Sequence, residues 1–140
     1  MPSRRETLIA ILDAHAEQNI DKIMAHHSDN FTWGVLPKSL GQAPLDNMAY
    51  RQMYESTAPA FRNYQATVVD IFEDEKENKA VVWINAAAET DVGPYVNEKM
   101  LVFYFDDAGK VSRTFEFIDS ASTAAWYSKL QQHSTEMGDN

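Results

Sequence analysis

Cysteine is absent from this sequence of 140 residues, so a disulfide, a zinc–thiolate site and a cysteine nucleophile are all excluded. Basic residues are scarce as well: 12 Lys and Arg compare with 21 Asp and Glu, for a net charge of −9. This charge argues against a nucleic-acid or anionic membrane surface, because both need a basic excess. No apolar run approaches the roughly 20 residues that span a bilayer, and Met1 is followed by no long apolar segment. These absences favour a cytoplasmic protein.

The rest of the composition is that of an ordinary globular protein, with 44% hydrophobic and 11% aromatic residues. A chain of this length fits one domain and is long enough to bury a core. We expect a single α+β barrel domain over residues 1–132 and a flexible tail at residues 133–140. The acidic run at residues 73–77 is interpreted as a solvated turn.

Hydrophobic periodicity predicts that the first part of the chain is helical. Leu8, Ile11 and Leu12 recur at helical spacing, and Ser3 with Glu6 matches a capping box. We therefore expect an amphipathic helix at about residues 4–18. The other elements expected in this part are a helix at 21–27, a strand at 31–36, a loop at 37–44 and a third helix at 45–61, with Asp46 as its N-cap.

From residue 64 onward the pattern changes to the period of two that is typical of strands. Long twisted strands make a sheet curl, and helices can close over its concave side. We therefore predict an α+β fold with a cone-shaped, curved antiparallel (mixed) sheet, three N-terminal helices and a pocket at its open end. The elements expected here are strands at 64–72, 80–89, 95–105 and 111–119, then a short helix at 120–131.

Several short segments, in this order and spacing, give the chain a family resemblance. They are Val35 to Gly41, Pro59 to Phe61, Gly93 to Glu98, Phe105 to Val111 and Glu116 to Ser120. On these segments the chain resembles the SnoaL-like members of the nuclear-transport-factor-2-like superfamily, and more closely the small fungal isomerases and cyclases of meroterpenoid and related pathways. The resemblance implies general acid–base chemistry without a cofactor or metal, a hydrophobic small-molecule substrate and a homodimer.

The sequence departs from these fungal proteins at two places. They commonly carry histidines where this chain has Thr32, Trp33 and Gly34, and they often carry a tyrosine where it has Lys99. The differences bear on the substrate and on the acid–base groups rather than on the fold.

Two acids near the end of the last strand are candidates for proton transfer. Burial in an apolar cavity raises the pKa of a carboxyl group toward neutrality, which suits a general acid or base. Glu116 alternates with Ile118 on one face of the strand, and Asp119 lies on the other face unless the strand end twists. The alternative roles are an outer-face partner for Glu116 and a helix N-cap for Asp119.

Three other side chains are candidate catalytic groups. Lys99 alternates with Glu98, so only one of the two can face the cavity squarely, and an inward Lys99 would stabilise an enolate oxygen. His27, next to His26, is a candidate proton shuttle, although such a residue can also cap a helix or face solvent. Tyr54 is a candidate donor, with core packing as the alternative.

The predicted substrate-binding residues combine aromatic and aliphatic walls with a few polar groups. They are Trp33, Lys38, Trp83, Asn85, Glu98, Leu101, Phe103 and Ile118. Together with the resemblance they favour an isomerase or cyclase acting on a polyketide- or terpenoid-derived intermediate. The alternatives are a dehydratase or epoxide hydrolase of the same fold, and a non-catalytic small-molecule-binding dimerisation domain.

Overall fold

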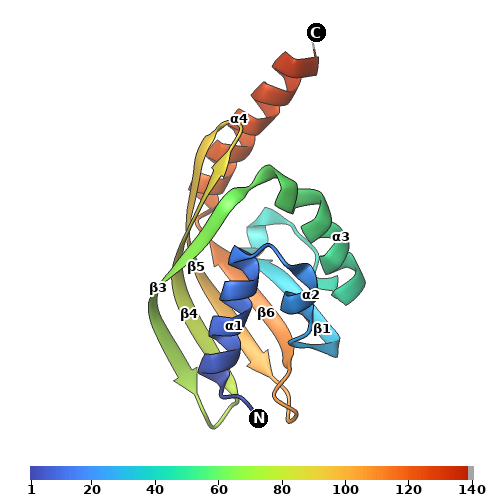
Figure 1. Ribbon diagram of the computed structural model, residues 1–140, viewed down its shortest axis with the longest axis vertical. Coiled ribbons are helices and arrows are strands. Elements are labelled where there is room, and N and C mark those ends of the chain that lie inside the picture. The colour runs from blue at the N-terminus through green and yellow to red at the C-terminus, as the bar shows by residue number, and fades with distance from the viewer. Residues whose placement is uncertain (139–140) are drawn as a thin grey trace.

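The computed structural model describes residues 1–138, which form four helices and one six-stranded sheet (Figure 1). The helices are α1 (Arg4–Ala16), α2 (Ile20–Met24), α3 (Asn47–Thr57) and α4 (Ser120–Gly138). The strands are β1 (His27–Leu36), β2 (Leu45–Asp46), β3 (Arg62–Asp74), β4 (Lys79–Thr90), β5 (Gly93–Phe105) and β6 (Val111–Ile118). Short 3₁₀ turns at Lys38–Leu40 and Ala58–Ala60 flank the β2–α3 segment.

The sheet is mixed and open, with strand order β2-β1-β6-β5-β4-β3. Strands β3 to β6 form the predicted antiparallel meander, whereas β1 pairs with β6 in parallel. The expected α+β class and curved mixed sheet are confirmed, but the sheet does not close into a barrel. Its two edges are β2 and β3, which do not pair with each other.

Helix α1 begins as the sequence predicts. Ser3 accepts a hydrogen bond from the Glu6 backbone N–H at 3.1 Å, and Glu6 Oε1 accepts one from the Ser3 backbone N–H at 3.2 Å. This reciprocal capping box satisfies two backbone donors that the first turn leaves free. The helix buries Leu8, Ile11 and Leu12 against β3 and β4, so its apolar stripe forms one side of the core.

The inner face of the sheet can be read from alternating burial. On β4, Val82 and Ile84 are fully buried, whereas their neighbours Trp83 and Asn85 lie on the opposite face. Helices α1, α2 and α3 all lie on the inner side of the sheet (Figure 1). The outer face has no helix over it in the part of the chain that the structure describes.

Several element boundaries differ from the prediction. Helix α2 ends at Met24, and β1 begins at His27, because the backbone pairs with β6 there: the Val111 N–H donates to the His26 carbonyl at 2.8 Å. Helix α4 continues past Gln131 to Gly138, and its end projects beyond the sheet (Figure 1). The helix therefore occupies most of the segment expected as a tail, and residues 139–140 lie outside the described chain.

Candidate functional site

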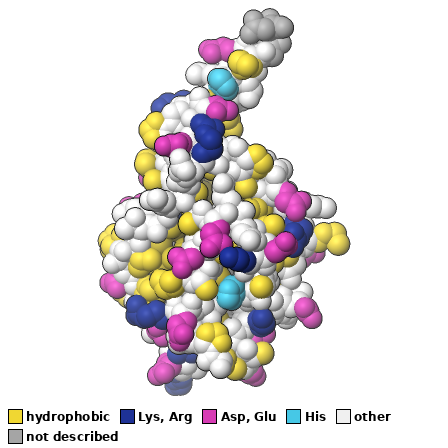
Figure 2. Space-filling model, in the orientation of Figure 1, with side chains coloured by type: hydrophobic (Ala, Val, Ile, Leu, Met, Phe, Trp, Pro, Cys, Tyr) yellow, Lys and Arg dark blue, Asp and Glu magenta, His cyan; other side chains and the backbone are white. Residues whose placement is uncertain are grey.

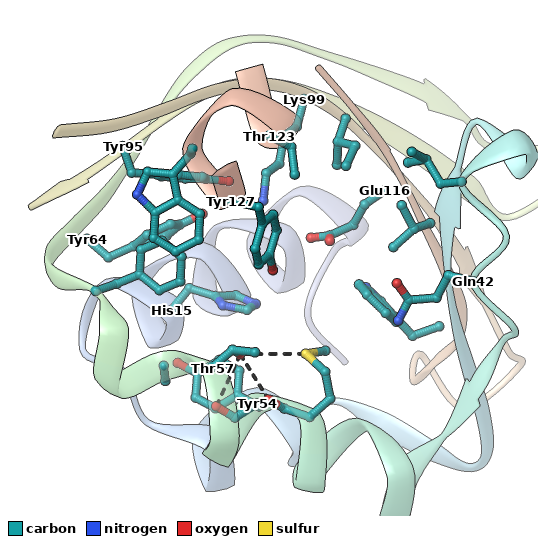
Figure 3. A pocket seen from close by; sticks show the side chains of 18 of the residues that line it. His15, Gln42, Tyr54, Thr57, Tyr64, Tyr95, Lys99, Glu116, Thr123 and Tyr127 are labelled. Atoms are coloured by element: carbon teal, nitrogen blue, oxygen red, sulfur yellow. Dashed lines mark hydrogen bonds between the residues drawn. The ribbon is translucent and has the colours of Figure 1, made fainter. Parts of the chain in front are cut away.

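A pocket of about 460 Å³ opens between the inner face of the sheet and the helices. This volume falls within the range of small-molecule sites, roughly 300–1,000 Å³. Figure 3 shows side chains from both the sheet and the helices directed into it. It is lined by His15 and Gln18 near the end of α1, Trp33 and Val35 on β1, Leu40 and Gln42, the α3 and following residues Tyr50, Met53, Tyr54, Thr57, Ala58 and Phe61, Tyr64 on β3, Tyr95 and Lys99 on β5, Glu116 and Ile118 on β6, and Ser120, Thr123, Ala124, Trp126 and Tyr127 on α4.

Lys99 and Glu116 are the two residues of opposite charge among those that line this pocket. In the β5–β6 register Lys99 pairs with Ile118, so Glu116 is its diagonal neighbour on the same face. Such neighbours lie roughly 7–8 Å apart at the backbone, a gap that two long side chains can bridge. An ammonium group and a carboxylate thus line the same largely apolar cavity (Figure 3) and act on each other through their charges rather than through a direct ion-pair contact.

The pKa of Lys99 is raised above its ordinary value. Burial is the largest influence and would lower it, but the carboxylate of Glu116, followed by Tyr64 and Tyr95, outweighs burial. Lys99 therefore remains a cation at any physiological pH. A permanent positive charge in a cavity can stabilise negative charge that develops on a bound oxygen.

Tyrosine hydroxyls surround this charged pair. The pKa values of Tyr54, Tyr64 and Tyr95 are all raised, in each case mainly because burial disfavours the phenolate. For Tyr64 and Tyr95 the charge of Lys99 works in the opposite direction. The three phenols therefore remain protonated and can donate hydrogen bonds.

The His15 ring lies in the same cavity. Its centroid is 5.8 Å from the ring of Tyr54 and 6.3 Å from that of Tyr64. Burial, with smaller contributions from Lys99 and His27, lowers the pKa of His15 to about 3. The imidazole is therefore uncharged at neutral pH, with one nitrogen that donates and one that accepts.

The first turns of α4 form another wall of the pocket and are tied to the sheet. The amide nitrogen of buried Asn97 donates to the Thr123 hydroxyl at 2.6 Å, and its oxygen accepts from the Asp119 N–H at 3.0 Å. Trp126 donates from Nε1 to the Thr90 hydroxyl at 3.2 Å and stacks on Phe61. These contacts hold Trp126 and Thr123 at the pocket wall.

Two predicted catalytic residues lie outside the pocket. Asp119 is exposed, and its carboxylate accepts from the Ser122 N–H at 3.1 Å, so it caps α4, which begins at the next residue. His27 stacks on Phe31 with ring centroids 3.6 Å apart, and its Nδ1–H donates to the Asn47 amide oxygen at 3.0 Å. It is therefore part of the packing behind the pocket wall, and the expectation that either side chain lines the cavity is corrected.

Three of the six other predicted residues that miss the pocket lie on the outer face of the sheet. Trp83 donates from Nε1 to Glu98 Oε2 at 2.9 Å there, and Asn85 is exposed on the same face. Alternation along a strand fixes this result, because Lys99 faces inward and Glu98 must then face outward. The remaining corrections are Lys38, which is exposed on a 3₁₀ turn, and Leu101 and Phe103, which are buried in the core.

The structure brings Glu116, Lys99, Tyr54, Trp33 and Ile118 together in one cavity. Sequence reasoning missed His15 and Gln42, which line the same cavity. His15 carried a detectable signal: it follows Leu8, Ile11 and Leu12 at helical spacing and so lies on the buried stripe of α1. A polar residue on such a stripe needs a partner or a function. For Gln42, in a loop, the sequence offered no periodic signal.

Neither a metal-binding cluster nor a membrane-spanning helix is found among residues 1–138. Residues 1–138 contain no group of three or more His, Asp or Glu side chains placed to hold a metal ion. None of the helices in this range combines the length and the apolar character needed to cross a bilayer. On the face seen in Figure 2, acidic and basic side chains are scattered and do not form a basic patch.

Comparison with known proteins gives relatives along most of the chain. The core atranone cluster protein 11 of Stachybotrys chlorohalonatus is 41% identical over 131 residues, which cover 94% of this chain and 98% of that protein. Monooxygenase AacuP of Aspergillus aculeatus is 27% identical, over 91% of this chain and 88% of that protein. No protein-family model matches the sequence.

Among solved structures, the BvnE pinacolase of Penicillium brevicompactum superimposes with a TM-score of 0.85. It is 24% identical, and the match covers 94% of this chain and 99% of that one. PrhC of Penicillium brasilianum also has a TM-score of 0.85, at 22% identity over 94% and 93% of the two chains. At these identities the match establishes the fold.

The curved sheet and the inner helices have the SnoaL-like, nuclear-transport-factor-2-like fold. Its 41% identity to core atranone cluster protein 11, over nearly the whole of both chains, shows that the chain belongs to a family of fungal secondary-metabolite cluster proteins.

Proposed function

We propose that this protein is an isomerase or cyclase that acts by general acid–base catalysis on a polyketide- or terpenoid-derived intermediate of fungal secondary metabolism. The observation that supports it most directly is the Glu116 carboxylate beside the Lys99 ammonium group in an aromatic pocket. The 41% identity to a protein of a secondary-metabolite cluster supports the pathway class. The chemistry of the pocket supports the reaction class.

In the proposed reaction Glu116 removes a proton from a carbon atom next to a carbonyl group. The electron pair of the C–H bond moves toward the carbonyl oxygen, where Lys99 stabilises the negative charge. The charge thus passes from Glu116 to an oxygen beside Lys99, and the net charge of the site is unchanged. In isomerisation the enolate then takes that proton back from Glu116 at another atom. In cyclisation the enolate carbon attacks a carbonyl carbon of the same molecule, and the alkoxide that forms takes the proton from Glu116. No external oxidant or reductant is needed.

Replacing Glu116 by Gln is expected to lower turnover about a hundredfold or more, the usual weight of a positioned acid–base group. The assay uses the intermediate that accumulates when the gene for this protein is deleted. The products are separated by chromatography, and their masses are measured by mass spectrometry. Asp119→Asn is the matched control, because Asp119 lies outside the pocket, and it should retain full turnover. Unchanged turnover in Glu116→Gln would contradict the proposal.

The mass of the product separates the alternatives in the same experiment. Isomerisation and cyclisation leave the mass unchanged, a dehydratase removes one water, and an epoxide hydrolase adds one. A gain of one oxygen atom would instead indicate oxygenation, the activity in the name of the relative from Aspergillus aculeatus. Conversion of none of the cluster intermediates, with tight binding of one of them, would favour a non-catalytic binding domain.

The protein is also proposed to form a homodimer through the outer face of the sheet. Exposed apolar side chains on this face include Val96, which is 60% exposed, and Phe117, which is 50% exposed. The strand register places two apolar rows across β4, β5 and β6, namely Trp83, Met100 and Phe117, and Val81, Val102 and Phe115. A second copy is a self-complementary cover for such a surface.

Sedimentation at micromolar concentration is expected to give the mass of a dimer. Phe117→Glu, at the β6 end of one apolar row, should shift the protein to a monomer because it places a charge in the interface. Glu73→Gln is the surface control: it changes an exposed residue on β3, away from the two apolar rows, and this variant should remain dimeric. A monomeric wild-type protein would refute the dimer.

A further inference from the structure

His15 lies in the last turn of α1 and directs its imidazole into the pocket. In Figure 3 the ring enters the cavity on the side of Tyr64 and Tyr54, whereas Lys99 and Glu116 extend into it from β5 and β6 on the other side. Its position on the buried stripe of the helix fixes this direction, because Leu8, Ile11 and Leu12 on the same stripe are in the core.

Neither ring nitrogen of His15 has a hydrogen-bond partner among residues 1–138. The imidazole lies tilted against the rings of Tyr54 and Tyr64, at interplanar angles of 58° and 48°. Polar groups that are withdrawn from bulk solvent in native proteins are almost always hydrogen-bonded to protein, water or ligand. The donor and the acceptor of this ring therefore remain available to a molecule in the pocket.

The hydrogen-bonding chemistry of His15 differs from that of the charged pair. Lys99 can only donate, and an ionised Glu116 can only accept. An uncharged imidazole has one donor and one acceptor, as a hydroxyl group does, and it can also donate to a carbonyl oxygen. Since Lys99 and Glu116 balance each other's charge, the pocket presents no unpaired charge to a third ionised group.

We propose that His15 is a specificity-determining residue, whose uncharged imidazole hydrogen-bonds a hydroxyl or carbonyl oxygen of the substrate at a site remote from the carbon that Glu116 deprotonates. The substrate is accordingly a neutral, oxygenated ring compound with two polar ends. The carbonyl group at the reacting end of the substrate rests on the proposed function. The hydrogen bond from His15 does not rest on it, because binding can be measured without turnover.

Binding can be followed without knowing the substrate. Trp33 and Trp126 line the pocket and report its occupancy by fluorescence, whereas Trp83 lies on the outer face and is removed as background by Trp83→Phe. The probes are 1-tetralone and its 5-, 6- and 7-hydroxy derivatives. All share one ketone, and they differ only by a hydroxyl at the other end of the ring system.

In the protein with His15, at least one hydroxytetralone is expected to bind about fivefold to tenfold more tightly than 1-tetralone, as one hydrogen bond would give. His15→Phe and His15→Leu should abolish that preference, and His15→Gln should retain most of it. Unchanged binding of 1-tetralone serves as the check that the pocket is intact in each variant. His15→Leu is included because its smaller side chain fits the pocket if the phenylalanine of His15→Phe is too large for the protein to fold.

The proposal is overturned if the hydroxyl preference persists in His15→Leu, or if no hydroxytetralone binds the His15 protein more tightly than 1-tetralone. Glu116→Gln separates this result from the proposed function. The variant should keep the hydroxyl preference even though its turnover is lost. Retained turnover in Glu116→Gln together with a preference that depends on His15 would refute the proposed function and leave this inference intact.

Discussion

Lowering the pH from 7 to 5 is expected to reduce the free energy of unfolding by about 4 kcal/mol, because two histidines are held uncharged in the folded protein. Burial is the main cause at both, and it lowers the pKa of His15 to about 3 and that of His27 to about 4. Both residues have an ordinary pKa of 6.5. A pH of 5 lies about 1.5 units below this ordinary pKa, so keeping one histidine uncharged at pH 5 costs the folded protein about 2 kcal/mol.

The direction follows from proton binding. As the pH falls below 6.5, the unfolded chain takes up a proton at each histidine while the folded protein does not, so acid favours unfolding. This stability is fully present above the ordinary pKa and is lost progressively as the pH falls toward 4 for His27 and 3 for His15. The lowered pKa of His26 acts in the same direction. Measurements at pH 5 and above avoid most carboxyl titration.

Urea denaturation at pH 7 and pH 5 measures this effect. His15→Gln keeps a polar side chain that cannot take a proton, so it should remove about half of the difference between the two pH values. His133→Gln, on the projecting end of α4, is the matched control and should leave the difference unchanged. If His15→Gln loses as much stability as the wild-type protein on acidification, the buried neutral histidine is not its cause.

The parts of the fold that depend on local sequence could be predicted. The Ser3–Glu6 capping box and the Asp46 N-cap are both present, and period-two alternation located the four meander strands. What could not be predicted was the pairing of β1 with β6, which brings together segments about 80 residues apart in the chain. That pairing also explains why His27 is in a strand rather than at a helix end.

The inward face of each long strand was ambiguous for a physical reason. On β5 the inner residues Asn97 and Lys99 are polar, whereas Val96 and Met100 on the outer face are apolar. A polar pocket and an apolar outer surface together remove the usual contrast between the two faces. The same ambiguity placed Trp83, Asn85 and Glu98 among the predicted pocket residues.

Which residues line the pocket also depends on how distant segments of the chain pack together. Glu116 and Asp119 are three residues apart, yet one lines the pocket and the other caps α4, because the strand ends at Ile118 and the helix begins at Ser120. His15 reaches the same cavity from a helix about 100 residues earlier. Local spacing contains no information on this convergence.

Separating Lys99 from its partner charge is expected to cost about 3 kcal/mol of unfolding free energy. Removal of one member of a buried pair of opposite charges leaves the other charge desolvated and unpaired, typically at 3–5 kcal/mol. Because both side chains are only partly buried, line an open pocket and make no direct ion-pair contact, no more than the lower end of this range is expected. Glu116→Gln and Lys99→Met should therefore each destabilise the protein, and Glu116→Gln should also lower the pKa of Lys99, since Glu116 is the largest influence that raises it.

A double-mutant cycle measures how strongly the two charges depend on each other. Lys99→Met with Glu116→Gln leaves no unpaired charge, so the double variant should recover much of the stability that either single change loses. Glu98→Gln is the matched control, since this neighbouring carboxylate lies on the outer face, and its effect should simply add to that of Lys99→Met. If the effects of Lys99→Met and Glu116→Gln are also additive, the two groups are not coupled. Glu116 would then not be the group that keeps Lys99 charged in the pocket.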